Sequence, residues 1–117
     1  MPYKIDVLEE SEIIEVIYSG DITLDERITV VHILCCEFDL FDRFKLLINS
    51  TKTKQKMSAV EQEIFGKFIA TKEEFKGARV AVLQPQKMEI LLDEAQKYGY
   101  QIRNFVSYDD ALNWLNQ

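Results

Sequence analysis

Short apolar runs of strand length alternate along this chain with longer amphipathic runs, and this alternation limits the possible folds. Strand-like runs occupy Tyr3–Leu8, Ile13–Tyr18, Phe44–Ile48, Ala78–Leu83 and Gln101–Val106, and a helix-like run follows each of the last four. A strand, a helix and a further parallel strand join as a right-handed crossover, which leaves few architectures. We therefore predict an α/β fold of order ββαβαβαβα, with a mixed sheet of about five strands and helices packed on it.

The first two runs are separated only by the polar residues Glu9–Glu12, which is typical of an antiparallel hairpin. Phe44–Ile48 lies between two helix-like segments, which favours a central parallel strand covered on both faces. Residues 49–57 are mostly polar, and we expect them to form a loop.

Capping signals mark where the helices begin. Thr23 with Glu26, and Ser58 with Glu61, have the capping-box spacing, and Ser107 is placed to cap the last helix. Gly77 is expected to end the second helix. Apolar residues at three- and four-residue steps predict the buried faces. These faces comprise Leu24, Ile28, Val31, Cys35 and Phe38; then Val60, Ile64, Phe68 and Phe75; then Met88, Leu91, Leu92, Ala95 and Tyr98; and finally Ala111, Leu112, Trp114 and Leu115.

Phe65 and Ile69 lie to one side of the second predicted face. If they are exposed, they form an apolar patch suited to a protein partner or a second copy of the chain. If they are buried, the helix simply has a wide core-facing surface. The sequence leaves both alternatives open.

Length and composition predict a single domain, residues 1–117, able to bury a core without metal or disulfide support. A net charge of −6 argues against nucleic acid as a partner. We expect no integral membrane segment, because no apolar run approaches about 20 residues. The start of the chain lacks the pattern of a signal peptide. Cys35 and Cys36 are adjacent and are expected to stay reduced, so a cytoplasmic location is predicted.

Charge is distributed unevenly. Residues 1–42 carry eleven acidic and two basic residues, whereas residues 43–56 carry five basic residues and no acidic one. Ligands of open α/β sheets bind beyond the carboxyl ends of strands, where loops lead into helix starts. This segment could therefore hold a phosphate, a carboxylate or an acidic partner surface, or it could simply be a solvated loop; the sequence favours the solvated loop and leaves both open. The candidate binding residues are Ser50, Thr51, Lys52, Thr53, Lys54, Lys56 and Ser58, with Phe65 and Ile69.

Four segments carry a resemblance to a known family: Ile17–Thr23, Lys45–Asn49, Ala78–Leu83 and Arg103–Leu115. Their order and spacing are similar to the STAS fold of anti-sigma-factor antagonists and sulfate-transporter tails. More narrowly, the chain looks like the small bacterial SpoIIAA-like proteins, a group also related to SEC14 domains. The resemblance implies a non-enzymatic binding or regulatory module.

In the anti-sigma-factor antagonists, a serine after the third strand is phosphorylated. Only Ser50 matches that motif here, because Asn49 stands in place of its aspartate and Lys52 in place of its glycine. The alternative is that Ser50 and Thr51 satisfy backbone groups in a turn.

The sequence offers no convincing catalytic or metal-binding set. His32 is the single histidine, it is expected to be partly buried, and no cofactor is predicted. Our first hypothesis is a non-enzymatic module that contacts a protein partner, or a second copy, through the basic loop and the second helix. The alternative is a carrier or sensor of a small apolar or anionic ligand, by analogy with lipid-binding SEC14 domains. Its expected pocket is lined by Phe38, Phe41, Phe65, Phe68 and Tyr98, with the anionic head at the lysines.

Overall fold

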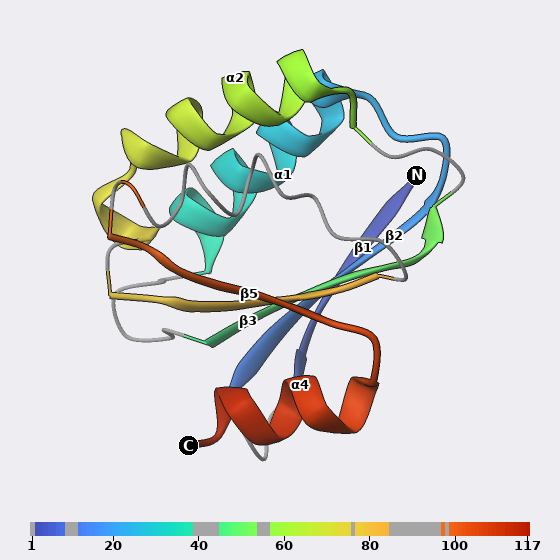
Figure 1. Ribbon diagram of the computed structural model, residues 1–117, viewed down its shortest axis with the longest axis vertical. Helices are drawn as coiled ribbons and strands as arrows, with labels where there is room; N and C mark the ends of the chain where they lie inside the picture. The colour runs from blue at the N-terminus through green and yellow to red at the C-terminus, as the bar shows by residue number, and fades with distance from the viewer. Residues whose placement is uncertain are drawn as a thin grey trace.

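A computed structural model describes residues 2–8, 12–38, 45–53, 57–75, 77–84, 97 and 99–117. Within these ranges five strands form one mixed sheet, whose spatial order β1-β2-β3-β4-β5 is also their order along the chain (Figure 1). The predicted α/β class is confirmed. The described elements are β1 (Tyr3–Leu8), β2 (Ile13–Gly20), α1 (Leu24–Glu37), β3 (Lys45–Thr53), α2 (Ala59–Ala70), the 3-10 turn η1 (Glu73–Phe75), β4 (Arg79–Leu83), β5 (Gln101–Phe105) and α4 (Tyr108–Leu115).

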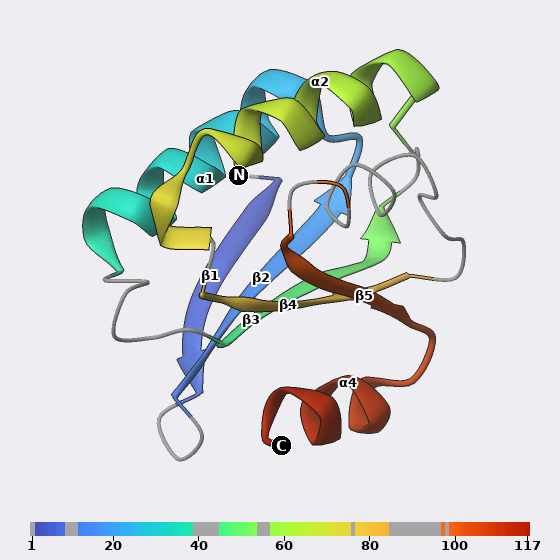
Figure 2. The same ribbon diagram turned by 60° about the vertical axis from the view of Figure 1, so that its left-hand side comes forward.

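The first two strands form the predicted antiparallel hairpin, with Tyr3 opposite Tyr18 and Leu8 opposite Ile13. The next three pairings, β2 with β3, β3 with β4 and β4 with β5, are all parallel. Right-handed crossovers that step in one direction place their helices on one face of the sheet. Accordingly, α1 and α2 lie side by side on one face, and α4 covers the other (Figures 1 and 2).

The third strand is longer than the sequence predicts. Its ladder continues past a register shift, where Tyr18 of β2 lies opposite two residues of β3, and then pairs Ser19 with Lys52 and Gly20 with Thr53. The prediction of a loop from residue 49 is therefore wrong for residues 49–53. Gly20 allows the chain to leave β2, because it adopts a φ of +70° without the steric strain of a side chain. Phe44, the predicted first residue of this strand, and residues 54–56 lie outside the described residues.

Two apolar cores lie on opposite faces of the sheet. Leu46 and Val80 point toward α1 and α2, whereas Leu47 and Ala81 point toward α4. Successive residues of a strand face opposite sides, so both faces of the central strands are buried. This confirms the prediction of a central strand covered on both sides.

Helix α1 begins with the predicted capping box: Glu26 N donates to Thr23 Oγ1, and Thr23 N donates to Glu26 Oε1. Its buried face, however, is not the predicted one. Arg27, Val30, Val31 and Leu34 are buried. The predicted face differs because apolar residues surround most of this helix, and the burial of an arginine cannot be inferred from apolar spacing. Of the predicted set, Val31 is buried, and Leu24, Ile28, Cys35 and Phe38 are only partly buried at the edge of the core.

Helix α2 also turns a different face to the sheet. Phe65 and Ile69 are buried, whereas Val60 and Ile64 are 65% and 47% exposed. The prediction that Val60 and Ile64 face the sheet is wrong, and so is the alternative of an exposed patch at Phe65 and Ile69. Gln62 joins the buried face because its side-chain amide donates to the carbonyl of Met57 at 3.0 Å. Because Gln62 is polar, the spacing of apolar residues does not predict that this side of the helix is buried.

The end of α2 differs from the prediction as well. The helix ends at Ala70 with Thr71 as its C-cap, well before Gly77. Phe75 is buried as predicted, but it belongs to η1 and not to the helix.

Helix α4 begins as predicted, with Ser107 Oγ accepting from Asp110 N at 3.3 Å. Ala111 and Leu115 are fully buried against the sheet. The predicted third helix, with Met88, Leu91, Leu92, Ala95 and Tyr98, lies outside the described residues.

Candidate functional site

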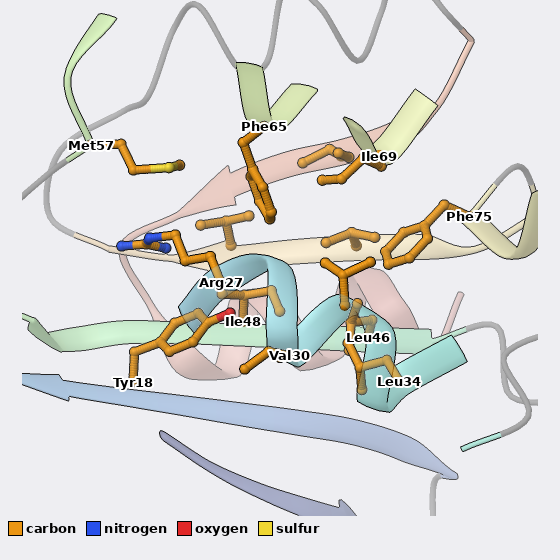
Figure 3. A pocket seen from close by; sticks show the side chains of 14 residues that line it. Tyr18, Arg27, Val30, Leu34, Leu46, Ile48, Met57, Phe65, Ile69 and Phe75 are labelled. Carbon is orange, nitrogen blue, oxygen red and sulfur yellow. The ribbon is translucent and has the colours of Figure 1, made fainter. Parts of the chain in front are cut away.

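A small apolar cavity lies between the sheet and the layer formed by α1 and α2, with a volume of about 40 Å³. Figure 3 shows side chains from strands and helices converging on it. From the sheet come Leu46, Ile48, Val80, Val82 and Ile102, and from the helices come Val30, Val31, Leu34, Phe65 and Ile69. Met57 and Phe75 lie toward opposite ends of the cavity. Among its described lining residues, only Tyr18 and Arg27 carry polar side-chain atoms that can donate a hydrogen bond.

Arg27 lies at the Met57 end of this cavity (Figure 3). It comes from the first turn of α1 and is only 3% exposed. Its guanidinium carbon lies 4.9 Å from the centroid of the Tyr18 ring, a cation–π contact. Burial lowers the pKa of Arg27, while the nearby Tyr18 and Glu61 partly oppose that effect. The same burial raises the pKa of Tyr18 to about 12.

The guanidinium of Arg27 lacks partners that a buried charge normally has. Its Nε atom is inaccessible to solvent and has no hydrogen-bond partner among the described residues. Within the described part of the chain, no acidic side chain lies within 4.0 Å of it. A buried charge without such partners is unfavourable, so this position has a cost in stability.

Three more buried polar atoms share this condition: Ser50 Oγ, Gln84 Nε2 and Asn104 Oδ1 have no described hydrogen-bond partner. Side chains two residues apart in a strand share a face. Ser50 follows Ile48, Gln84 follows Val82, and Asn104 follows Ile102, and all three of those neighbours line the cavity. All three polar side chains therefore face the α1–α2 side, at the carboxyl ends of β3, β4 and β5.

Ser50 and Gln84 are neighbours on adjacent strands, and Asn104 lies opposite Val82, one step nearer the cavity. Arg27 lies on the other side of Ser50. The Arg27 guanidinium stacks on Tyr18. In the β2–β3 ladder, Ile17 pairs with Asn49 and Ser19 pairs with Lys52, and Tyr18 lies between them. Tyr18 is therefore next to Ser50. We call Arg27, Ser50, Gln84 and Asn104 the polar row. It crosses the carboxyl edge of the parallel strands, where ligands of open α/β sheets bind.

The opposite face of the sheet carries a polar cluster whose members do have partners. Buried Glu15 accepts from Asn49 Nδ2 at 3.3 Å and from the Tyr108 hydroxyl at 3.1 Å. Thr51 Oγ1 donates to Asn49 Oδ1 at 2.7 Å. Burial raises the pKa of Tyr108, and its hydrogen bond to the Glu15 carboxylate adds to that effect. This cluster is explained by its own hydrogen bonds.

The structure separates the predicted binding residues. Ser50 is buried on the cavity side, whereas Thr51 is exposed and bonded on the opposite face. Lys52 is exposed, and Thr53 is half-buried with its hydroxyl donating to the carbonyl of Ser50. Ser58 is exposed and caps α2. Lys54 and Lys56 lie outside the described residues. Since Ser50 is 3% exposed, its hydroxyl is not accessible to a kinase in this conformation.

The predicted aromatic pocket differs from the cavity. Phe65 lines the cavity together with Ile69. Phe68 is half-buried at the edge of the core, where His32 of α1 meets it edge-on at 5.6 Å and Lys72 Nζ lies 5.0 Å from its ring. His32 is exposed, so the prediction of a partly buried histidine is wrong. Phe38 is half-buried and is not among the described lining residues; Phe41 and Tyr98 lie outside the described residues.

Sequence reasoning missed Arg27, Gln84 and Asn104. Arg27 is a charged residue in a first helical turn, and such residues are nearly always solvated. Gln84 and Asn104 are detectable only from strand alternation, because each continues an apolar face by one position. Among the described residues, no three acidic, histidine or cysteine side chains gather as metal ligands would. No helix in the described ranges has the length and apolar character needed to cross a bilayer.

No protein-family model matches this sequence, and no curated protein matches it. A solved structure does: an uncharacterised protein of the DUF3478 family from Shewanella loihica PV-4, which has a SpoIIAA-like fold. The match has a TM-score of 0.54 and covers 97% of this chain and 91% of that chain, at 18% sequence identity. The likeness shows the fold, and this chain has a SpoIIAA-like fold, as its sequence resemblance predicts.

Proposed function

We propose that this SpoIIAA-like chain is a non-enzymatic binding module that holds a small ligand between its sheet and the α1–α2 layer. The observation that carries the proposal is the apolar cavity bordered by the polar row. Apolar walls with a few convergent polar groups are the usual composition of small-molecule sites. A cytoplasmic location fits the two cysteines, which are outside any disulfide in the described part of the chain.

The geometry favours this ligand-binding role over the protein-contact role that the sequence suggests first. Phe65 and Ile69, expected on a contact surface, line the cavity instead. Ser50 belongs to the polar row and not to an exposed loop. These three candidate residues therefore support binding inside the fold.

Xenon tests whether the cavity accepts a guest, because xenon enters apolar cavities without needing a polar contact. We expect methyl resonances of Val30, Ile48 and Ile69 to shift saturably with xenon pressure. Val30→Leu fills part of the space and should reduce these shifts. Val16→Leu is the matched control, since Val16 is buried in the same core but is not among the described lining residues. Unchanged methyl spectra under xenon would refute the proposed function.

A second candidate function is self-association through the outer face of α2. The observation that favours it is the exposure of Val60 and Ile64, two apolar side chains one turn apart. The chain itself offers complementary charge: residues 1–42 are acidic, and residues 43–56 are basic. A second copy can therefore supply the partner surface, at an affinity that decreases with salt.

Light scattering across a concentration series tests this second candidate. We expect a concentration-dependent dimer that the double change Val60→Ser with Ile64→Ser weakens. Val106→Ser is the matched control, because Val106 is a 78% exposed apolar side chain that follows β5 and does not belong to α2. A monomer at all concentrations, or equal loss with the control variant, would exclude α2 as the contact.

A further inference from the structure

We propose that the ligand is a short-chain aliphatic carboxylate, bound with its carboxylate at the polar row and its alkyl tail in the apolar cavity. This inference rests on the proposed function and names its ligand class. It follows from the kind of polar atoms available, from their place in the fold and from the size of the cavity.

The polar row is suited to an anion. Arg27 Nε and Gln84 Nε2 are donors, and the Ser50 hydroxyl can donate as well. A carboxylate accepts several hydrogen bonds at once, and bonds that involve ionised groups are the stronger kind. Asn104 Oδ1 is an acceptor, and a water bound to the carboxylate can donate to it. A carboxylate would also place an opposite charge directly against buried Arg27, which forms no salt bridge within the described residues.

The positions of these groups set the direction of the ligand. Ser50 and Gln84 are neighbours on adjacent strands, because Asn49 pairs with Leu83 one residue earlier. Their backbones are therefore about 4.8 Å apart, close enough for both side chains to reach one carboxylate. Ile48 and Val82, one step back on the same face, line the cavity. A carboxylate at the polar row thus directs its tail along the strands toward Leu46 and Val80.

The size of the cavity limits the tail. A cavity needs a volume of about 10–15 Å³ to hold one water-sized molecule. A cavity of about 40 Å³ therefore accommodates about three non-hydrogen atoms. This matches the three tail carbons of butyrate and excludes an extended fatty-acid chain. Branching within the same atom count remains compatible with the cavity.

Titration with butyrate, followed by NMR, tests the inference directly, because an arginine Nε–H gives its own resonance. We expect the Arg27 Nε–H signal to shift saturably with butyrate. Butyramide is a neutral isostere, inorganic phosphate has no alkyl tail, and the tail of dodecanoate is too long for the cavity. Each should therefore bind at least about tenfold more weakly than butyrate.

Two variants and one control assign the contact. Arg27→Met should raise the dissociation constant for butyrate about ten- to a hundredfold, and Ser50→Ala should raise it several-fold. Arg103→Met is the matched control, since Arg103 is exposed and stacks on Phe105 and Trp114 on the α4 side. Binding in this control should stay unchanged. Backbone NMR spectra of each variant establish that it is folded before the titration is interpreted.

The outcomes separate this inference from the proposed function. If xenon enters the cavity but butyramide binds as well as butyrate, or Arg27→Met binds butyrate like wild type, the carboxylate assignment is overturned while ligand binding stands. Tighter binding of phosphate or dodecanoate than of butyrate overturns it too. If neither xenon nor butyrate binds, both proposals fail.

Discussion

Replacing Arg27 by methionine should make the protein without ligand more stable. Arg27 is 3% exposed, and its Nε has no hydrogen-bond partner among the described residues. An unsatisfied buried donor costs about 1–3 kcal/mol, and more when it is charged. Methionine has a similar length, no charge and an adaptable shape, so it can occupy the same space. The change removes that penalty.

One favourable contact is lost in the same substitution. The cation–π contact with Tyr18, at 4.9 Å, contributes about 1–2 kcal/mol at a desolvated site. Because the unsatisfied donor is charged, its penalty is taken as about 3 kcal/mol, so the net expectation is a gain of about 1–2 kcal/mol in the free energy of unfolding. Unfolding entropy is about 2.1 cal/mol/K per residue, so for a chain of 117 residues each kcal/mol raises the melting temperature by about 4 °C.

Urea unfolding, followed by circular dichroism and by Trp114 fluorescence, measures this free energy. Arg103→Met, the same chemical change at an exposed position, should stay within about 0.5 kcal/mol of wild type. Arg27→Lys keeps the buried charge and should not be stabilising. A loss of more than about 1 kcal/mol in Arg27→Met would refute the reasoning, because the guanidinium would then stabilise the fold on balance.

Three further predictions concern stability. Because burial raises the pKa of Tyr18 from 10.0 to about 12, the folded state holds that proton more tightly than the unfolded state, and stability is lost as the pH rises from 10 to 12. Between pH 10 and 12, the free energy of unfolding of Tyr18→Phe should therefore fall by about 3 kcal/mol less than that of wild type, as measured by urea unfolding at alkaline pH. Ser58→Ala removes the capping hydroxyl of α2 and should lower the free energy of unfolding by about 1 kcal/mol; Thr71→Ala, at the other end of α2, offers a comparison. Leu115→Ala opens space under α4, where Leu115 is fully buried, and should lower it by about 3 kcal/mol; a loss below 1 kcal/mol would mean that α4 packs loosely.

Much of the architecture follows from local signals in the sequence. The capping boxes at Thr23 and Ser58 were identifiable because a hydroxyl and a carboxylate three residues apart satisfy the same free amides wherever they occur. The hairpin and the parallel strands follow from apolar runs of strand length and from the rule of right-handed crossovers. These signals depend little on distant parts of the chain.

Helix orientation could not be predicted in the same way. On α2, Val60 with Ile64 and Phe65 with Ile69 are both apolar pairs spaced by four residues, and spacing alone cannot choose between them. The choice depends on a contact outside the helix, since buried Gln62 bonds with its side-chain amide to the carbonyl of Met57. The extension of β3 through Thr53 likewise depends on its partner strand, because the residues themselves are polar.

The polar row is the part of the site least accessible to sequence reasoning. The sequence predicts that Ser50 lies in a loop, yet Ser50 is buried in a strand. Gln84 and Asn104 can be assigned to the site only when the register of the strands is known. Arg27 can be assigned to it only when the packing of α1 on Tyr18 is known. Each residue comes from a different element, so no local motif could identify the group.

The identical order of the strands in space and along the chain has a consequence for biosynthesis. As the polypeptide leaves the ribosome, every new strand finds its neighbour already made, and none must be inserted later between two others. We expect nascent chains arrested after β4 to protect β1–β3 against protease, because their pairings are complete before β5 exists. Protection that arises only when β5 has emerged would instead indicate that the whole sheet assembles in one cooperative event.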